Sequence, residues 1–367
     1  MLERLSQLID PMMLAVLLTQ LVAIGLGFWL VRRRLHGLWR TSAFALLGLL
    51  ALRVALFGNP VAWGAYYVAL QGHADWRQTD VIAERFRSLM PARPGAEFLA
   101  IGSSQTFAIY REITRGRDDL QLFSLAGMTP MDMMLYRDRI LALRPQHVLL
   151  YISEFDLAAE LRPEWARLAP VPLLRIPDQV AALRAALPSD ALPDLQRDLV
   201  LGALLPEYRY NFVFRDILSR SASLAGLPGF RPQRGADDAV NYAALTARAT
   251  QPMEGMSRLL EAFIGSLREA GIGTVLVEGQ YNPHGETPGL LQQHRAFGAY
   301  LSALQQRHPD LLILRRDELP LLSSGDFDDA YHLSPAAGHR MAEAVLQAAR
   351  HRLGQATAIS RLEAPPR

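Results

Sequence analysis

The chain has 367 residues, a formal net charge of only +2, and neither cysteine nor lysine, so all 38 of its basic residues are arginine. These counts exclude thiol catalysis, disulfides and thiolate metal sites. They also exclude every mechanism that needs a lysine, such as a Schiff base, a P-loop or a Ser–Lys dyad. The small net charge gives no support for nucleic-acid binding. Half of the residues are hydrophobic, and the mean hydropathy of +0.08 is high for a soluble enzyme, so part of the apolar content is expected to lie elsewhere than in a soluble core.

Two apolar runs open the chain. The first, PMMLAVLLTQLVAIGLGFWLV at residues 11–31, has Gln20 as its only strongly polar residue. It is long enough to cross a hydrocarbon core of about 30 Å as a helix. The second run covers residues 42–58 and is interrupted by Arg53. A charge deep in lipid costs at least about 2.5 kcal/mol, but Arg53 lies near the far end of the run, where its side chain can reach the interface. We therefore predict two transmembrane helices.

The short loop between the two runs, residues 32–41, is rich in arginine. Its arginines are Arg32, Arg33, Arg34 and Arg40. The positive-inside rule places this loop in the cytoplasm. Residues 1–70 would then be a membrane anchor, and the chain from residue 72 onward would lie on the periplasmic or extracellular side of the cytoplasmic membrane. In the alternative, residues 42–70 form a buried or interfacial helix, and the large domain lies inside the cell.

From residue 96 onward, buried strand patterns alternate with helix patterns. The strands are predicted at residues 96–102, 120–127, 147–153, 274–280 and 311–318. The helices are predicted at residues 129–145, 256–272, 288–308 and 334–353, with Thr129 and Ser334 as N-caps. Strands that alternate with helices of ten or more residues form a mostly parallel sheet with helices on both faces. We expect a three-layer α/β/α fold of flavodoxin-like type around a five-stranded sheet.

The α/β domain is predicted to span residues 72–354. Residues 157–252 interrupt the alternation, since they are rich in Leu, Ala, Pro and Arg and contain no buried strand run. We interpret them as a mostly helical insertion at the strand ends, a natural place for a lid or an acceptor platform. Residues 355–367 are expected to be a disordered tail.

Two serines, Ser103 and Ser104, follow the first predicted strand and precede a helix start. Ligands bind at the carboxyl ends of the strands in open α/β sheets, and a helix N-terminus there offers N–H groups to a developing oxyanion. A serine nucleophile needs a base, and the base needs an orienting partner. Asp329 and His332, which lie just before the last helix, have the types and spacing for these two roles.

Each of these features also has a plainer interpretation. Small residues such as Ser103 and Ser104 occur in many strand-to-helix turns. Asp329 and His332 could form a loop hydrogen bond with no chemistry. The combination in this chain order favours a Ser–His–Asp triad over the separate interpretations.

The sequences IGSSQT at residues 101–106 and DAYHLSPAAGHRMA at residues 329–342 resemble the first and last blocks of the SGNH/GDSL-type hydrolases, with GSS in place of GDS. The resemblance covers roughly residues 96–156 and 256–350. It implies that Ser104 is the nucleophile, His332 the base and Asp329 the partner of the base. It also implies that Gly127, which matches the glycine of the second block, shares the oxyanion hole with the Ser104 N–H group.

The third block departs from the G-x-N-D pattern of that family, because the matching stretch is YISEFDL, with Ser153 and Glu154. A side-chain donor to the oxyanion is worth about 3 kcal/mol, and an ionised Glu154 would repel the oxyanion. Ser153 and Asn282 are the candidate replacements for the missing asparagine. Membrane-anchored relatives that modify cell-envelope polymers also depart from this block. They include the D-alanine transfer protein of teichoic-acid modification and proteins of alginate O-acetylation.

The resemblance implies an acyl transferase that passes an acyl group, acetyl being favoured, through Ser104 to a sugar hydroxyl of an envelope polysaccharide. A membrane-bound O-acyltransferase is the partner that family analogy implies. The same triad would serve an esterase, and the altered third block leaves open an inactive assembly subunit of an acylation complex. No cofactor is implied, and no spacing among the Asp and His residues supports a metal site.

Overall fold

The computed structural model describes residues 11–34, 36–70, 76–89, 95–114, 116–159, 161, 165–184, 186–187, 189–211, 213 and 253–363. The chain divides into two compact units. The first unit comprises Met1–Ala92 and Leu205–Ala236, and the second comprises Arg93–Leu204 and Asp237–Arg367. The first unit therefore includes part of the segment that the sequence predicted to be an insertion of the α/β domain.

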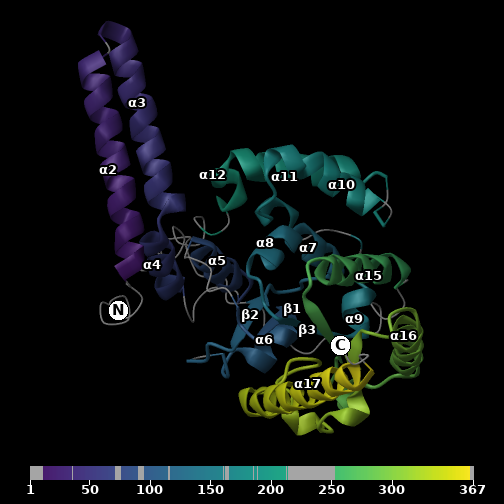
Figure 1. The fold of residues 1–367 in the computed structure, drawn as a ribbon. Coiled ribbons are helices and arrows are strands. Elements are labelled where there is room, and N and C mark those ends of the chain that lie inside the picture. Colours follow the sequence, from purple (N-terminus) through teal and green to yellow (C-terminus); the bar gives the residue numbers. More distant parts are fainter. Residues whose placement is uncertain are drawn as a thin grey trace, which may run out of the picture. The chain divides into compact units, whose positions relative to one another are not determined.

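Four helices of the first unit come from the N-terminal part of the chain. They are α2 (Pro11–Arg34), α3 (Gly37–Arg53), α4 (Pro60–Leu70) and α5 (Trp76–Leu89). Helices α2 and α3 lie side by side as a hairpin (Figure 1). The rings of Phe28 and Phe44 stack between the two helices, with their centroids 5.7 Å apart. Because α5 packs against α4, the first unit extends to Ala92 and does not end near residue 70.

Helix α3 continues through a π-helical turn, Val54–Gly58. Together they form a helix, Gly37–Gly58, of 22 residues with a mean hydropathy of 1.8. Within the described part of the chain this is the one helix that is long and apolar enough to cross a membrane. This assignment rests on length and composition only. It coincides with the second predicted span. The first predicted span lies in α2 and stays a prediction.

The hairpin exposes large apolar side chains along both helices. Leu26 and Trp29 on α2, and Leu46 and Leu50 on α3, are about half exposed or more. Exposed apolar surface of this extent marks a site that meets lipid or another protein. The hairpin therefore presents apolar surface on both of its helices.

The π-helical turn Val54–Gly58 leaves carbonyl groups that the regular helical pattern does not satisfy. Side chains of α2, α4 and α5 supply the donors. Gln20 donates to the last carbonyl of the turn at 2.8 Å, and Trp63 and Arg85 donate to the carbonyl of Phe57 at 3.1 Å and 2.9 Å. The turn is thus fixed by its neighbours in the first unit.

Arg53, the charge that interrupts the second apolar run, has a partner. Its Nε and Nη2 atoms donate to the two carboxylate oxygens of Glu207 at 2.6 Å and 2.5 Å. Glu207 lies on α12 (Pro206–Arg209), in the segment that joins the first unit from later in the chain. The cost of a lone charge in an apolar helix is therefore offset by an ion pair.

The second unit is built on five strands. They are β1 (Phe98–Gly102), β2 (Leu120–Ser124), β3 (His147–Ile152), β4 (Gly273–Glu278) and β5 (Leu312–Leu314). All neighbouring strands are parallel, and their order is β2-β1-β3-β4-β5. The predicted five-stranded parallel sheet is confirmed, and each predicted strand overlaps an observed one. This strand order reverses between β1 and β3, which is where ligands bind in such sheets.

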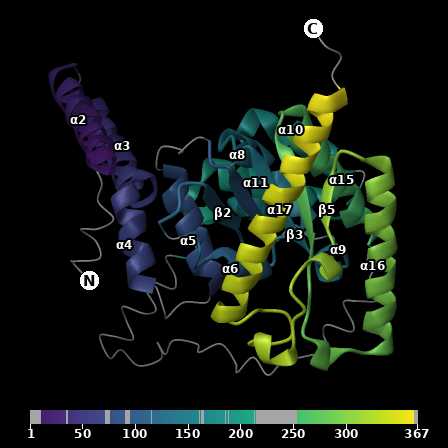
Figure 2. The ribbon, with the colours of Figure 1, turned by 60° about the horizontal axis from the view of Figure 1, so that its bottom comes forward.

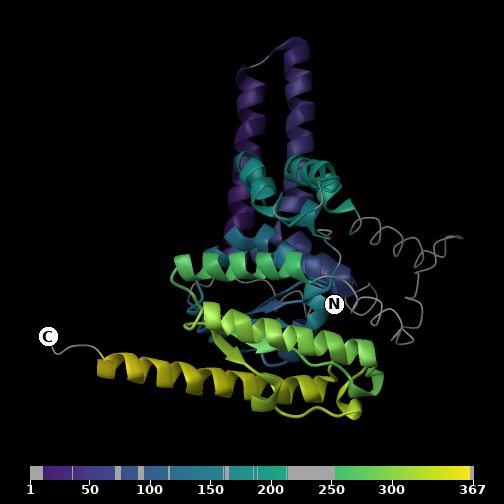
Figure 3. The same cartoon turned by 90° about the vertical axis from the view of Figure 1, so that its right-hand side faces the viewer.

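Helices cover both faces of the sheet (Figures 2 and 3). One face carries α6 (Ser104–Tyr110) and α17 (Pro335–Glu363), and the other carries α7 (Pro130–Leu135), α8 (Arg137–Ala142) and α15 (Glu254–Glu269). Helix α16 (Pro288–Arg307) packs beside β5. All five residues of β1 are buried, as expected of a parallel strand covered on both faces.

Two helix predictions need correction. The helix expected at residues 129–145 is two short helices separated at Tyr136, although Thr129 is its N-cap as predicted and shares a capping box with Asp132. Helix α17 continues to Glu363, so residues 355–363 are helical and not a disordered tail. Gln355, Ala356, Ala358 and the final Arg361, Leu362 and Glu363 favour a helix, and this stretch contains neither proline nor glycine.

The described part of the insertion is helical, as predicted. It follows α9 (Glu154–Leu157) and contains α10 (Ile176–Arg184), α11 (Leu192–Leu204), α12 and two 3₁₀ turns, Ala166–Leu168 and Leu173–Arg175. Trp165 Nε1 donates to the Ala126 carbonyl at 3.1 Å, and Gln179 Nε2 donates to the Met134 carbonyl at 2.7 Å. These bonds attach the insertion to the loop and helix that follow β2. Residues 214–252 of the predicted insertion lie outside the described residues.

Candidate functional site

The candidate site lies at the carboxyl ends of the strands. Ser104 is the first residue of α6, directly after β1, and Asp329 and His332 lie in the loop before α17. Helices α6 and α17 pack closely on one face of the sheet. A Cβ at Gly338 would lie 2.3 Å from the Ala108 carbonyl, so only glycine lets the start of α17 approach the α6 backbone. This approach brings the loop of His332 to Ser104.

The structure brings Ser104, His332 and Asp329 together in one chain of hydrogen bonds. Ser104 Oγ is 2.7 Å from His332 Nε2, and His332 Nδ1 is 2.5 Å from Asp329 Oδ2. Ser104 is 7% exposed, and the His332 and Asp329 side chains are 20% and 27% exposed. The hydroxyl is thus held inside the protein, while the imidazole is open to solvent on one side.

Asp329 is held in its ionised form. Burial raises its pKa, but hydrogen bonds from the His332 side chain and from the backbone N–H groups of Tyr331 and His332 outweigh burial and leave the pKa below its ordinary value. These backbone bonds reach Asp329 Oδ1 at 2.9 Å and 2.7 Å. An ionised carboxylate on Nδ1 fixes that nitrogen as the protonated one, so Nε2 can accept a hydrogen bond from the Ser104 hydroxyl.

The loop around Asp329 is supported from β4. The Asn282 N–H group donates to the Ala330 carbonyl at 2.8 Å, and Asn282 Nδ2 donates to the Asp329 carbonyl at 3.1 Å. The loop is closed further along by an antiparallel bridge between Phe327 and Leu333. Asn282 therefore supports the loop of the triad, and its side chain is not placed as an oxyanion donor.

The turn that carries the serines depends on glycine. Gly102 has a φ of 157°, and a Cβ there would lie 2.1 Å from Thr106 Oγ1. The N–H group of Leu125 donates to the Gly102 carbonyl at 3.3 Å, which ties the loop after β2 to this turn. Gly127 lies two residues further along that loop, with a φ of 70°. Its backbone N–H remains the candidate partner of the Ser104 N–H group.

Ser153 is not free to act as an oxyanion donor. It is completely buried, and its N–H and Oγ both donate to Asp156 Oδ2, at 2.8 Å and 2.9 Å. These bonds form the capping box at the start of α9. The expectation that Ser153 or Asn282 replaces the missing asparagine is therefore not supported by their contacts.

Glu154, whose charge was expected to disturb the site, is neutralised by a residue that the sequence analysis did not identify. Its carboxylate is fully buried and lies 3.0 Å from Arg316 Nη2. His294 Nδ1 lies 3.5 Å from the same group. Arg316 follows β5 in the chain, and two adjacent arginines after a buried strand are the signal that could have revealed it. The charge of Glu154 is thus balanced without involving Ser104.

Aromatic side chains line the protein beside the triad. The ring centroids of Tyr331 and His332 are 4.3 Å apart. The ring centroid of Phe155 lies 6.5 Å from that of Tyr331 and 5.9 Å from that of Tyr281. Together with Leu290 they form a small apolar cluster separate from the main core. His332 therefore has apolar side chains on one side.

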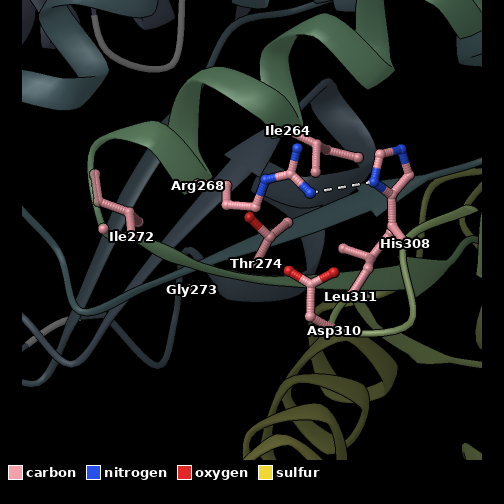
Figure 4. A pocket seen from close by; sticks show the side chains of 9 residues that line it. Ile264, Arg268, Ile272, Gly273, Thr274, His308, Asp310 and Leu311 are labelled. Atoms are coloured by element: carbon pink, nitrogen blue, oxygen red, sulfur yellow. Dashed lines mark hydrogen bonds between the residues drawn. The ribbon is translucent and has the colours of Figure 1, made fainter.

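A hollow of about 260 Å³ lies elsewhere (Figure 4). Its lining includes Arg268 and His308, whose side chains meet at 3.5 Å, and Thr274 and Asp310. These residues surround the amino ends of β4 and β5, at the edge of the sheet opposite Ser104. The hollow is thus separate from the triad. Within the described ranges, no three His, Asp or Glu side chains are grouped so that they could hold a metal ion.

Comparison with known proteins gives no identification. No model of a protein family matches the chain, and no curated protein sequence matches it either.

Proposed function

We propose that the protein is a serine-dependent acyl transferase of the SGNH/GDSL type, anchored in the cytoplasmic membrane. The observation that carries the proposal is the hydrogen-bonded series Ser104–His332–Asp329. Adjacent side chains of these three types, with the serine at a helix start and a strand end, have the geometry of nucleophilic acyl transfer. The strand order, with its reversal beside Ser104, supports the same location.

In the proposed reaction, Ser104 Oγ attacks the carbonyl carbon of an acyl donor while its proton moves to His332 Nε2. The N–H groups of Ser104 and Gly127 stabilise the oxyanion. The leaving group takes the proton from His332, and the acyl group remains as an ester on Ser104. A sugar hydroxyl then attacks this ester, and its proton passes through His332 back to Ser104 Oγ. Asp329 stabilises the imidazolium in both steps.

The N-terminal helices support the proposed location of the reaction. The apolar helix Gly37–Gly58 and the exposed apolar surface of the hairpin support a membrane anchor. Arginines at the end of α2 and at the start of α3 support a cytoplasmic connection between these helices, and the triad would then face the periplasmic or extracellular side. We propose an envelope polysaccharide as acceptor, acetyl as the acyl group and a membrane-bound O-acyltransferase as the partner that delivers it.

An esterase with the same triad is the second candidate function. The solvent-exposed side of His332 favours it, since water can approach the base there. An inactive assembly subunit is less well supported, because the serine, the imidazole and the carboxylate are all within bonding distance.

The test uses the full chain in non-ionic detergent. A fluorophosphonate probe is attacked by an activated serine with loss of fluoride, so we expect it to label the wild-type chain on Ser104. Asp329→Asn should lower the labelling rate by about 10⁴-fold, because the imidazole then adopts the wrong tautomer. Ser104→Ala should not label. Equal labelling of Ser104→Ala and the wild type would refute the proposal.

A second measurement separates the two enzymatic candidates. The wild-type chain is incubated with p-nitrophenyl acetate in the presence of acetyl-free polysaccharide fragments. Acetate release that is unchanged by the fragments supports the esterase, whereas acetylated fragments support the transferase.

A further inference from the structure

The loop that presents Asp329 and His332 is held at its base and at its tip by different parts of the chain. At the base, the N–H group of Asp328 donates to the His332 carbonyl at 2.9 Å. At the tip, the carbonyl groups of Asp329 and Ala330 both accept hydrogen bonds from Asn282. The base is thus closed by the loop itself, whereas the tip is bonded to a residue that follows β4.

The two ends of the Asn282 side chain have different partners. Its Nδ2 atom donates to the Asp329 carbonyl at 3.1 Å, and its Oδ1 atom accepts the His284 N–H group at 3.0 Å. A carbonyl only accepts and a backbone N–H only donates, so these partners determine the orientation of the amide. Asn282 is also buried, with 7% of its surface exposed. The amide therefore joins the short turn Pro283–Gly285 to the tip of the loop.

The backbone of Asn282 acts on Asp329 through one peptide group. The Asn282 N–H group donates to the Ala330 carbonyl at 2.8 Å. The N–H group of the same peptide, which belongs to Tyr331, donates to Asp329 Oδ1 at 2.9 Å. Because a peptide group is planar, the directions of its carbonyl and its N–H are fixed relative to each other. Asn282 therefore orients the carboxylate of Asp329 through a rigid group that lies between them.

The orientation of Asp329 is passed on to the serine. Asp329 Oδ2 lies 2.5 Å from His332 Nδ1, and His332 Nε2 lies 2.7 Å from Ser104 Oγ. Hydrogen bonds weaken steeply when their angle or length departs from the preferred geometry. A displacement of Asp329 therefore weakens the first bond and turns the imidazole away from Ser104.

We propose that Asn282 is a positioning residue of the triad: its Nδ2 donor holds the tip of the loop where Asp329 makes its short bond to His332. Tyr281 and Leu290 pack against Ala330 in the same loop, but apolar contacts are not directional and do not orient its carbonyl groups. The inference rests on the proposed function for its effect on reactivity. The effect on the bond between Asp329 and His332 is independent of the reaction.

The first experiment observes that bond directly. The full chain with isotope-labelled histidine is studied by NMR in non-ionic detergent. A proton in a short bond to a carboxylate resonates far downfield, and His332→Gln identifies the signal by removing it. In Asn282→Asp we expect the signal to move upfield and broaden, because Asp keeps an acceptor for the His284 N–H group but offers no donor to the Asp329 carbonyl. An unchanged signal in this variant would overturn the proposal.

The second experiment measures the rate at which the fluorophosphonate probe labels Ser104, at one pH for all variants. We expect the rate to fall about tenfold in Asn282→Asp, because the base is displaced from the serine. Asn282→Ala also lacks the donor, so it should show the same fall in rate and the same change of the NMR signal. It replaces Asn282→Asp if the introduced carboxyl group prevents folding. A wild-type rate in the folded variant would overturn the proposal.

Thr287→Ala is the matched control in the same segment. Thr287 Oγ1 accepts the Leu290 N–H group at 3.2 Å at the start of α16, so this variant loses a local hydrogen bond that does not involve the loop of the triad. It should lower stability but keep the downfield signal and the labelling rate. Loss of the signal in this control would show a general loosening and overturn the specific role of Asn282.

The two proposals fail in different ways. If Ser104→Ala labels like the wild type, the proposed function fails. The NMR signal then decides the role of Asn282 by itself, because the bond between Asp329 and His332 is present whether or not the serine reacts.

Discussion

The two edges of the parallel sheet hold their charged side chains in different ways. At the amino edge, Arg350 bridges Glu97 and Asp119 at 2.6 Å each, and all three side chains are at least about a third exposed. At the carboxyl edge, Glu154 is fully buried and Asp156 nearly so. The same kinds of residue are thus solvated at one edge and enclosed at the other.

The charged groups at the two edges should therefore differ in how much their removal changes the free energy of unfolding. Exposed ion pairs contribute about 0–1 kcal/mol, whereas a buried charge without a partner costs several kcal/mol. At the edge where Ser104 lies, the buried charge of Glu154 is held by its ion pair with Arg316, so the loss of that partner should be costly. Measurements of stability can therefore test the comparison directly.

The largest effect is expected for Arg316→Ala. It leaves the buried Glu154 without its cation, which should lower the free energy of unfolding by about 3–5 kcal/mol. Urea unfolding in non-ionic detergent, followed through the fluorescence of Trp165 and the other tryptophans, measures the change. The double variant Glu154→Gln, Arg316→Ala should recover part of the loss. A loss below 1 kcal/mol in the single variant would show that the carboxyl edge is as solvated as the amino edge.

An intermediate, pH-dependent effect is expected for Asp156→Asn. The folded-state pKa of Asp156 is about 6, raised from 3.8, so the protonated form stabilises the fold, and this stabilisation is lost as the pH rises from about 4 to about 6. The variant should be more stable than the wild type at pH 7 by up to about 3 kcal/mol, with no difference at pH 4. Thermal unfolding at both pH values checks this. Lower stability of the variant at pH 7 would contradict it.

The smallest effect is expected for Arg350→Ala at the amino edge. Arg117 and Arg350 hold the pKa of Asp119 well below its ordinary value, but solvent and salt screen such exposed pairs. The loss should be about 1 kcal/mol at low salt and smaller at 1 M salt. A loss as large as that of Arg316→Ala would remove the distinction between the two edges.

Local signals were sufficient to predict the sheet and the proximity of Ser104, His332 and Asp329. A strand covered on both faces is a continuous apolar run, as FLAIG is, and topology alone places strand ends together. The motif of Asp329 and His332 is compact in sequence. Their approach to Ser104, across 228 residues, follows from the rule that parallel strands share a carboxyl edge.

The pairs that neutralise charge were not predictable in the same way. Arg316 and Glu154 are 162 residues apart, and Arg53 and Glu207 are 154 residues apart. No periodicity connects residues at such separations, and both arginines have many possible acidic partners. The break at Tyr136 was missed for a different reason, since the packing of two short helices overrides a continuous helical pattern.

The π-helical turn at the end of α3 also determines how the chain continues. A π turn bonds each carbonyl to the fifth residue ahead, so it accommodates one residue more than a regular turn. Deleting a single residue between Val54 and Gly58 would restore an ordinary helix and rotate everything after it by about 100°. The direction of α4 relative to the apolar helix therefore depends more on the number of residues in the turn than on which residues they are.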